Sequence, residues 1–338
     1  MYLRFAKLAG RELWNDELIQ LQNTIGPFQS ALQRISRGEL TYFPGDYLIT
    51  YPFVQIFHFN KWGVNIPHIL AAILGYYLLY LICRRSFKTI WGLVIAFAVF
   101  TFNAELIFHA FEFRPYAVLP TLSLASFYFS GKLVNDYSFL NRFNKCLIGL
   151  FFLFTAFYHA YGILIVVFPM TYFLLTRENY SHLKRIFGEM KYFLLIVGFS
   201  SVVIYLWYGT KNVAIGQLYP QLQHLNTFQF IPHPIENPIG FLKGIVGNLL
   251  GDKRLYILLA GPCVSFVMSP HRLKQMFFLL ILIIIPLLLI LIVDLQKQYW
   301  FVQRQFVWII PLFALFIAWS WESIIIQWRM TTRTEKLC

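Results

Sequence analysis

The stretch VNIPHILAAILGYYLLYLIC, residues 64–83, is a continuous apolar run that contains no Asp, Glu, Lys or Arg. A helix needs about 17 to 25 apolar residues to cross a bilayer, so this run predicts a transmembrane helix. The rest of the chain shares its character, because 58% of the 338 residues are hydrophobic and only 13% are charged. Spans in lipid are expected to be helices, since every backbone polar group must be satisfied within the segment. We therefore expect an all-α polytopic membrane protein.

Eight further apolar runs follow along the chain. They lie near residues 89–109, 115–131, 146–158, 161–176, 191–209, 254–270, 275–293 and 304–322. The runs 146–158 and 161–176 could form a single re-entrant element, but the charge pattern favours two spans because the chain must turn twice there. The prediction is a bundle of about nine transmembrane helices.

The basic residues set the expected orientation of this bundle. They gather in every second connection, represented by Arg84, Lys132, Arg177 and Arg272. Such connections are typically cytoplasmic, which makes the loops 13–63 and 210–253 external. We expect one transmembrane domain over 1–322, with short surface helices on its external loops, and a cytoplasmic tail over 323–338. Met1 would then be outside, so a further transmembrane helix is expected upstream.

The first external loop opens with Leu13-Trp14-Asn15-Asp16-Glu17-Leu18, an acidic pair in a chain of net charge +13. Helix capping is one interpretation, with Asn15 as the N-cap and both carboxylates at the positive end of the helix dipole. The other interpretation is a catalytic base that faces the aqueous side of a membrane-embedded site. The remaining motifs favour the second.

On the capping interpretation the segment is a short amphipathic helix. Its apolar stripe is expected to consist of Leu18, Leu21 and Ile25. Gly26 and Pro27 are expected to end it, because glycine and proline typically follow the last turn of a helix.

Other unusual polar residues fall at the external ends of the predicted spans. Glu105, His109 and Glu112 are four and three residues apart and so share one helix face. This face could be a helix end wetted by interfacial water or, on a weaker signal, a metal-binding face. Pro115 suits the first turn of the next span and disfavours helix at Arg114, so we expect the chain to turn there.

Two further external segments carry candidate residues. His159 and Tyr161 lie at the break between two spans, where a histidine satisfied at the interface is the alternative to a functional one. Lys297 and Arg304 precede the last span, where they could meet lipid phosphates or serve a site. Residues 239–251 are expected to form a helix that lies on the membrane, although ordinary helix packing explains their pattern equally well.

The order of these motifs resembles that of the GT-C-fold glycosyltransferases related to protein O-mannosyltransferases and lipid A aminoarabinose transferases. The resemblance covers about residues 10–322. It rests on the acidic pair after Leu13-Trp14, on Glu112-x-Arg114-Pro115-Tyr116, on His159-x-Tyr161-Gly162 and on Gln303-Arg304 ahead of an apolar span with Pro311. The His-Pro-Pro element that the family often has later in the first loop is replaced here by Gly45-Asp46-Tyr47 and Tyr51-Pro52.

This resemblance implies a GT-C-type bundle that transfers a sugar from a polyprenyl-phosphate donor outside the cytoplasmic membrane. Asp16 and Glu17 then correspond to the catalytic motif, with Asp16 our first choice as the base and Glu17 the second. The residues expected to bind substrate are Glu112, Arg114, Tyr116, His159, Tyr161, Lys297 and Arg304. Among them Arg304, Arg114 and Lys297 would stabilise the departing phosphate, because arginine holds phosphate oxygens bidentately. We expect Asp16, Glu112 and the segment 294–304 to converge.

The expected partners are this donor, membrane lipids and an acceptor that is a glycan, a lipid or a protein. No nucleic-acid partner is expected, because the basic residues follow the membrane topology. No metal ligands are assigned, and a divalent cation is the one cofactor left open. The sequence contains no phosphate-binding loop and no dinucleotide fingerprint.

Two other functions compete with glycosyl transfer. A transporter or lipid flippase is expected to show internal repeats or broken spans near the membrane midplane, whereas here the polar residues gather at one face. A non-catalytic paralogue of the transferases would retain the fold and lack the chemistry.

Overall fold

The structure is a computed structural model that describes residues 12–13, 15–37, 44–58, 60–110, 112–136, 140–159, 161–176, 237–268, 273–297 and 303–334, with isolated positions between 184 and 235. Every regular element in these ranges is a helix. The all-α prediction is therefore confirmed for the part of the chain that the structure describes.

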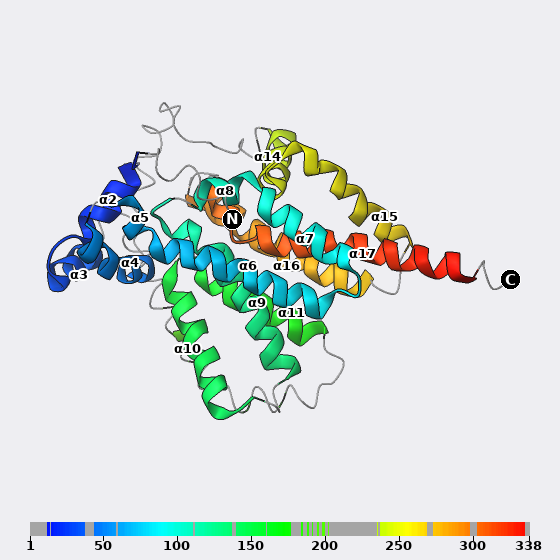
Figure 1. Ribbon diagram of the computed structural model, residues 1–338, viewed down its shortest axis with the longest axis horizontal. Helices are drawn as coiled ribbons and strands as arrows, with labels where there is room; N and C mark the ends of the chain where they lie inside the picture. The colour runs from blue at the N-terminus through cyan, green and yellow to red at the C-terminus, as the bar shows by residue number, and fades with distance from the viewer. Residues whose placement is uncertain are drawn as a thin grey trace.

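Four short helices occupy the segment before the first long apolar run. They are α2 (Asn15–Thr24), α3 (Phe28–Arg37), α4 (Pro44–Phe57) and α5 (Lys61–Val64), and they cluster at one end of the molecule (Figure 1). Gly26 has a φ of 88° and forms the turn between α2 and α3, as the sequence predicted. Asn60 begins α5 by accepting hydrogen bonds from the amides of Trp62 and Gly63.

The longer helices form the body of the protein. They are α6 (Ile66–Ser86), α7 (Ile90–Phe102), α9 (Leu119–Asn135), α10 (Arg142–Tyr158), α11 (Gly162–Thr176), α16 (Leu273–Lys297) and α17 (Ile310–Thr334). Helices α8 (Ala104–His109), α14 (Pro238–Leu250) and α15 (Ala260–Met268) and the 3₁₀ turns η1 (Pro115–Ala117), η3 (Lys253–Leu259) and η5 (Gln303–Phe306) connect or flank them. Helix α14 agrees with the helix expected over 239–251.

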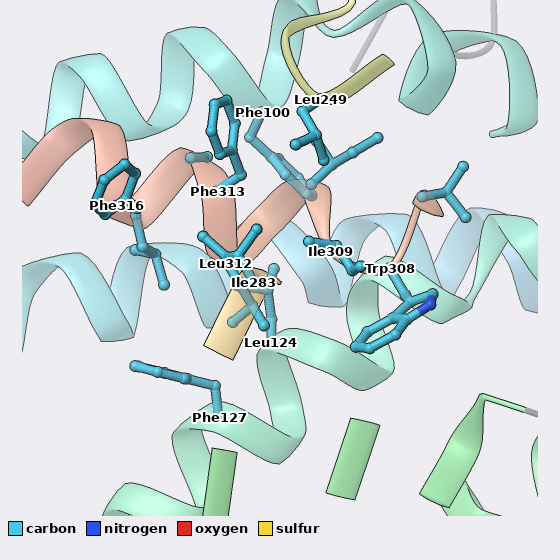
Figure 2. Packing of buried hydrophobic residues seen from close by; sticks show 14 of the residues in the cluster. Phe100, Leu124, Phe127, Leu249, Ile283, Trp308, Ile309, Leu312, Phe313 and Phe316 are labelled. Carbon is cyan, nitrogen blue, oxygen red and sulfur yellow. The ribbon is translucent and has the colours of Figure 1, made fainter. Parts of the chain in front are cut away.

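Helix α17 is the centre of the apolar core. Leu312 and Ile317 on this helix have no exposed surface. Phe100 of α7, Leu124 of α9 and Ile283 of α16 surround it (Figure 2). A helix that is apolar on all sides must be covered by protein or lipid, and here the protein covers it. We call these residues of α7, α9, α16 and α17 the apolar core.

Helix α6 is less buried than α17 and exposes much of its apolar surface. Of its most apolar stretch 39% is buried, against 67% for α17. Leu70, Ile73, Leu74 and Tyr77 lie among its exposed side chains. Such an exposed apolar face on one helix is what a lipid-facing span presents.

By length and composition, two of the described helices could cross a membrane, Ile66–Ser86 and Ile310–Met330. Shorter apolar helices are Ile90–Phe102, Gly162–Thr176, Pro238–Leu250 and Leu279–Ile292. The total of about nine spans therefore stays a prediction, and the run 191–209 lies outside the described residues apart from isolated positions. The choice of two helices over a re-entrant element for 146–158 and 161–176 agrees with α10 and α11.

One predicted span ends earlier than expected. The run 89–109 was assigned to a single helix, but α7 stops at Phe102 and α8 begins after Asn103. The Asn103 side chain accepts a hydrogen bond from the amide of Leu106 and donates to the carbonyl oxygens of Asn248 and Leu249. An asparagine that caps one helix and holds the end of another interrupts a run that hydropathy alone reads as continuous.

Candidate functional site

The acidic pair lies on α2, whose packed face is polar. Glu17 has no exposed surface, and its Oε1 accepts a hydrogen bond of 2.5 Å from the Phe113 amide. Gln20 and Thr24 are also fully buried on this helix. Glu17 therefore attaches α2 to the 112–116 segment.

The predicted apolar stripe of α2 is confirmed at Leu21 and is wrong at Leu18 and Ile25. Leu21 is 1% exposed, but Leu18 is 41% and Ile25 37% exposed. Hydrophobic spacing misassigned the face because each buried polar side chain has a partner, which removes the cost of burying it. The side chain of Asp16 lies outside the described residues, as does that of Lys297, the last residue of α16.

The chain turns sharply between α8 and α9, as the proline predicted. Arg114 is extended, with φ −151° and ψ 157°, and Pro115 is the first residue of η1. Proline fixes its own φ and disfavours helix at the preceding residue, so α8 cannot continue into α9. The turn brings Glu112 back toward His109 at the end of α8.

His109 and Glu112 are buried and form a charge cluster with Glu105, whose side chain is 15% exposed. His109 Nδ1 lies 2.5 Å from Glu112 Oε2, and its Nε2 lies 3.5 Å from Glu105 Oε2. Burial lowers the pKa of His109, but the two carboxylates outweigh this and raise it to about 9. Burial raises the pKa of Glu112, but His109, with Arg304 and Arg114 beyond it, lowers it to about 2. Both groups are therefore charged near neutral pH.

This charge cluster does not resemble a metal site. Among the described residues, no group of three or more His, Cys, Asp or Glu side chains could hold a metal ion. A divalent cation stays an untested expectation, since the Asp16 side chain is outside that set.

Tyr116 is where three distant parts of the chain meet. The Arg304 Cζ atom of η5 lies 5.1 Å from the centroid of the Tyr116 ring. The His159 ring, at the junction of α10 and α11, lies 5.6 Å away on centroids, and the His109 ring 5.7 Å. Glu112 and Arg304 are 192 residues apart in the chain, yet they lie close enough for their charges to interact, as expected.

His159 is held in a neutral, oriented state. Its Nδ1 accepts a hydrogen bond of 3.3 Å from the Tyr161 amide. Loss of hydration lowers its pKa to about 3, and the positive charges of Arg114 and Arg304 act in the same direction, while the negative charge of Asp46 opposes them. A neutral imidazole whose Nδ1 accepts carries its proton on Nε2 and is a hydrogen-bond donor there. Tyr161 in turn stacks on Trp308, with ring centroids 6.2 Å apart.

Sequence reasoning missed a second cluster, which we call the polar junction: Gln20, Asp46, His68 and Tyr158. Each of the four residues is at most 1% exposed. Gln20, His68 and Tyr158 surround the Asp46 carboxylate. Burial raises the pKa of Asp46, but His68, Tyr158 and Gln20 outweigh this and hold it below its ordinary value. One signal was available, because an ionisable residue such as His68 inside a predicted span implies a partner.

The residues around Tyr116 are suited to bind an anion such as a phosphate beside the acidic end of α2. Arg114, Arg304 and the Nε2–H of neutral His159 provide positive charge and donors around Tyr116. Arginine and oriented donors together bind phosphate oxygens. Glu17 is fixed to Phe113, which lies between Glu112 and Arg114, so the acidic end of α2 borders the same segment.

Comparison with known proteins adds one finding. Residues 44–207 match the family model described as dolichyl-phosphate-mannose-protein mannosyltransferase. Searches of the curated proteins and of the solved structures found no match. The matched range contains Asp46, the 112–116 segment and His159, and it excludes the acidic pair and Arg304.

Proposed function

We propose that this protein is a membrane glycosyltransferase that moves a sugar from a polyprenyl-phosphate donor to an acceptor hydroxyl on the external face of the cytoplasmic membrane. The observation that carries the proposal is the meeting of Arg304, Tyr116 and the Glu112 charge cluster beside the acidic end of α2. The family match over 44–207 supports the same reaction class. The sugar is a hexose or pentose, and the acceptor is a glycan, a lipid or a protein.

The reaction needs a base and a stabilised leaving group. The acceptor oxygen forms a bond to the anomeric carbon while the bond from that carbon to the phosphate oxygen breaks. Asp16 takes the hydroxyl proton, and the phosphate leaves with the bonding electron pair. Arg304 and Arg114 stabilise the charge that grows on the phosphate, since donors placed where charge develops lower the barrier most.

Glu17 and Asp16 take different parts in this scheme. The Glu17 carboxylate is engaged with the Phe113 amide and fully buried, so it holds α2 in place. Asp16 is the base, because the Glu17 carboxylate already accepts a hydrogen bond from the Phe113 backbone amide. The charge pair His109–Glu112 fixes the turn that presents Arg114 and Tyr116.

Asp16→Asn tests the chemistry, with Glu17→Gln as the matched change next to it. An amide cannot accept the acceptor's proton, so Asp16→Asn is expected to lower sugar transfer by about 10²- to 10⁴-fold. Glu17→Gln keeps an oxygen that accepts from Phe113 and is expected to lose far less. The measurement is the consumption of polyprenyl-phosphate-linked sugar by membranes that contain each variant at matched levels.

Arg304 provides the second arm of this experiment. Arg304→Ala is expected to slow transfer and Arg304→Lys to restore it only in part, because lysine lacks the planar fork of donors. Arg85→Ala, which removes a partly exposed ion pair with Asp136 at the other end of α6, is the control and is expected to leave transfer unchanged. Full activity in Asp16→Asn, Glu17→Gln and Glu112→Gln would contradict the proposed reaction.

A further inference from the structure

The buried carboxylate of Asp46 joins elements that carry the proposed site without touching the groups proposed to react. We propose that Asp46 is a positioning residue, which holds α2 and its acidic pair in register with the α10 end that leads into His159. This inference rests on the proposed function. It assigns a role in the reaction to a residue that lies outside the convergence around Tyr116.

Three helices supply hydrogen-bond donors to this one carboxylate. Gln20 Nε2 from α2 donates to Oδ2, and the Tyr158 hydroxyl from α10 donates to Oδ1. His68 Nε2 from α6 lies 3.2 Å from Oδ1. Asn65 orients the His68 ring through a contact of 3.2 Å to Nδ1, and its own amide nitrogen donates to the Lys61 carbonyl. Asp46 thus fixes α2, α6 and α10 relative to α4.

The backbone next to Asp46 adds a second, independent constraint. A Cβ atom at Gly45 would lie 2.5 Å from Tyr158 Cα, which is closer than real side-chain contacts come. The first turn of α4 therefore packs directly on the backbone at the end of α10. A glycine immediately before the aspartate permits this approach, and the hydrogen bond from Tyr158 then sets the register.

Two routes lead from Asp46 to the 112–116 segment. Along α2, Gln20 lies one turn after Glu17, whose carboxylate accepts from the Phe113 amide. Along α10, Tyr158 directly precedes His159, whose ring contacts Tyr116. Both sets of contacts end at the 112–116 segment, so a displacement of α2 or of α10 is expected to move Arg114 and Tyr116.

The His68 ring closes the arrangement from a third side. It lies edge-on to Phe113, with ring centroids 5.7 Å apart. Phe113 is fully buried, so the turn that carries Glu112 and Arg114 is packed against the polar junction as well as hydrogen-bonded to Glu17. The position of that turn therefore depends on the residues that surround Asp46.

Asp46 acts through its neighbours because it is sealed from substrate. It is 1% exposed, and it already accepts from Gln20, Tyr158 and His68. A carboxylate in that state has no access to an acceptor hydroxyl. It acts on the reaction through geometry, where a displacement of about 1 Å can cost about 10²-fold in rate, and its negative charge also acts on His159.

Tyr158→Phe tests this role with the smallest possible change, since it removes one hydroxyl and keeps the ring. The expected result is a fall in kcat of about tenfold or more, with the KM for the donor changed less than about twofold. Hydrogen–deuterium exchange of α2 in the purified, monodisperse protein is expected to rise. Tyr172→Phe makes the same change in a tyrosine that is 5% exposed near the far end of α11 and is expected to match the wild type in both readouts.

Substitutions at Asp46 provide the conservative-rescue arm. The Gln20 Oε1 atom is buried without a hydrogen-bond partner in the described structure. In Asp46→Asn a rotation of the Gln20 amide presents this oxygen to the new amide nitrogen, so the junction can re-form without the charge. Asp46→Asn is therefore expected to keep more of the wild-type kcat than Asp46→Ala does.

The outcomes separate this inference from the function on which it rests. Wild-type protein without any sugar transfer would overturn the proposed reaction, and the exchange measurement on α2 would still decide whether Asp46 holds that helix. Transfer by the wild type together with unchanged kcat and unchanged α2 exchange in both Tyr158→Phe and Asp46→Ala would overturn the positioning role. Equal loss in Tyr172→Phe would overturn it too, because the effect would not be specific to the junction.

Discussion

The apolar core and the polar junction are both buried, but different forces hold them. Around Leu312 and Ile317 of α17 the contacts are apolar and have no required direction. Around Asp46 each contact is a hydrogen bond with a specified donor. Apolar packing depends on volume and tolerates rearrangement, whereas a buried polar group needs its particular partner. The core therefore assembles the bundle, and the junction fixes one arrangement of the helices at the site.

The largest expected effect comes from removing the carboxylate at the junction. Asp46→Leu leaves the donors of Gln20 and Tyr158 and the His68 ring without their shared acceptor. Each of these donors that is left buried without an acceptor costs about 1 to 3 kcal/mol of folding free energy. Thermal unfolding of the detergent-solubilised protein measures this loss.

A second variant sharpens that result. Adding Tyr158→Phe to Asp46→Leu removes one of the stranded donors, so the double variant is expected to lose less than the two single losses combined. Strict additivity would mean that the junction is not a coupled unit, and the contrast with the core would then fail.

The charge cluster at His109 gives an intermediate effect that depends on pH. The pKa of His109 is raised from 6.5 to about 9, so its stabilising charge is fully present below pH 6.5 and lost as the pH rises toward 9. The pKa of Glu112 is lowered from 4.5 to about 2, so its contribution is present above pH 4.5 and lost as the pH falls toward 2. Both contributions are fully present between pH 4.5 and 6.5, so the unfolding temperature is expected to be highest there.

His109→Gln is the control for this pH profile. Glu105, Glu112 and, through Glu112, Arg114 and Arg304 are the charged groups that face His109. Without the imidazole, the decrease in unfolding temperature between pH 6.5 and 9 is expected to shrink. A decrease of the same size in the variant and the wild type would assign it to other groups.

The smallest effect is expected in the apolar core. Ile317→Val removes one methylene from a side chain with no exposed surface and is expected to cost about 0.5 to 1.5 kcal/mol. Sugar transfer per folded molecule is expected to stay at the wild-type level, because the core holds the bundle and not the site. A loss of kcat comparable to that of Tyr158→Phe would erase the distinction between the two regions.

Periodicity and turn chemistry predicted much of the local structure. The apolar run at 64–83 predicted α6, Gly26 predicted the end of α2, and Pro115 predicted the break after Arg114. Each of these signals acts within a few residues, through hydropathy or through an allowed range of φ. They are therefore visible in the sequence without knowledge of the fold.

The misassignments have a different origin. Leu18 and Ile25 were expected to line the apolar stripe of α2, yet Glu17 and Gln20 form its buried face. Their partners, the Phe113 amide and Asp46, are 96 and 26 residues away in the chain. A polar side chain is buried when a partner removes its desolvation cost, and that partner is supplied by another part of the fold. Spacing along one helix contains no such information.

The sequence alone therefore predicted the helical, apolar character that the described residues show, because continuous apolar runs cannot be left in water. It also identified Glu112, Arg114, Tyr116, His159 and Arg304 as candidates. Only the tertiary structure decided that Arg304 lies over Tyr116, that Glu17 is committed to the Phe113 amide and that Asp46 joins three helices. Hydropathy is a property of each residue in its own segment. Hydrogen bonds and ion pairs act over a few ångströms between atoms of different segments, so they are fixed only when the helices have packed.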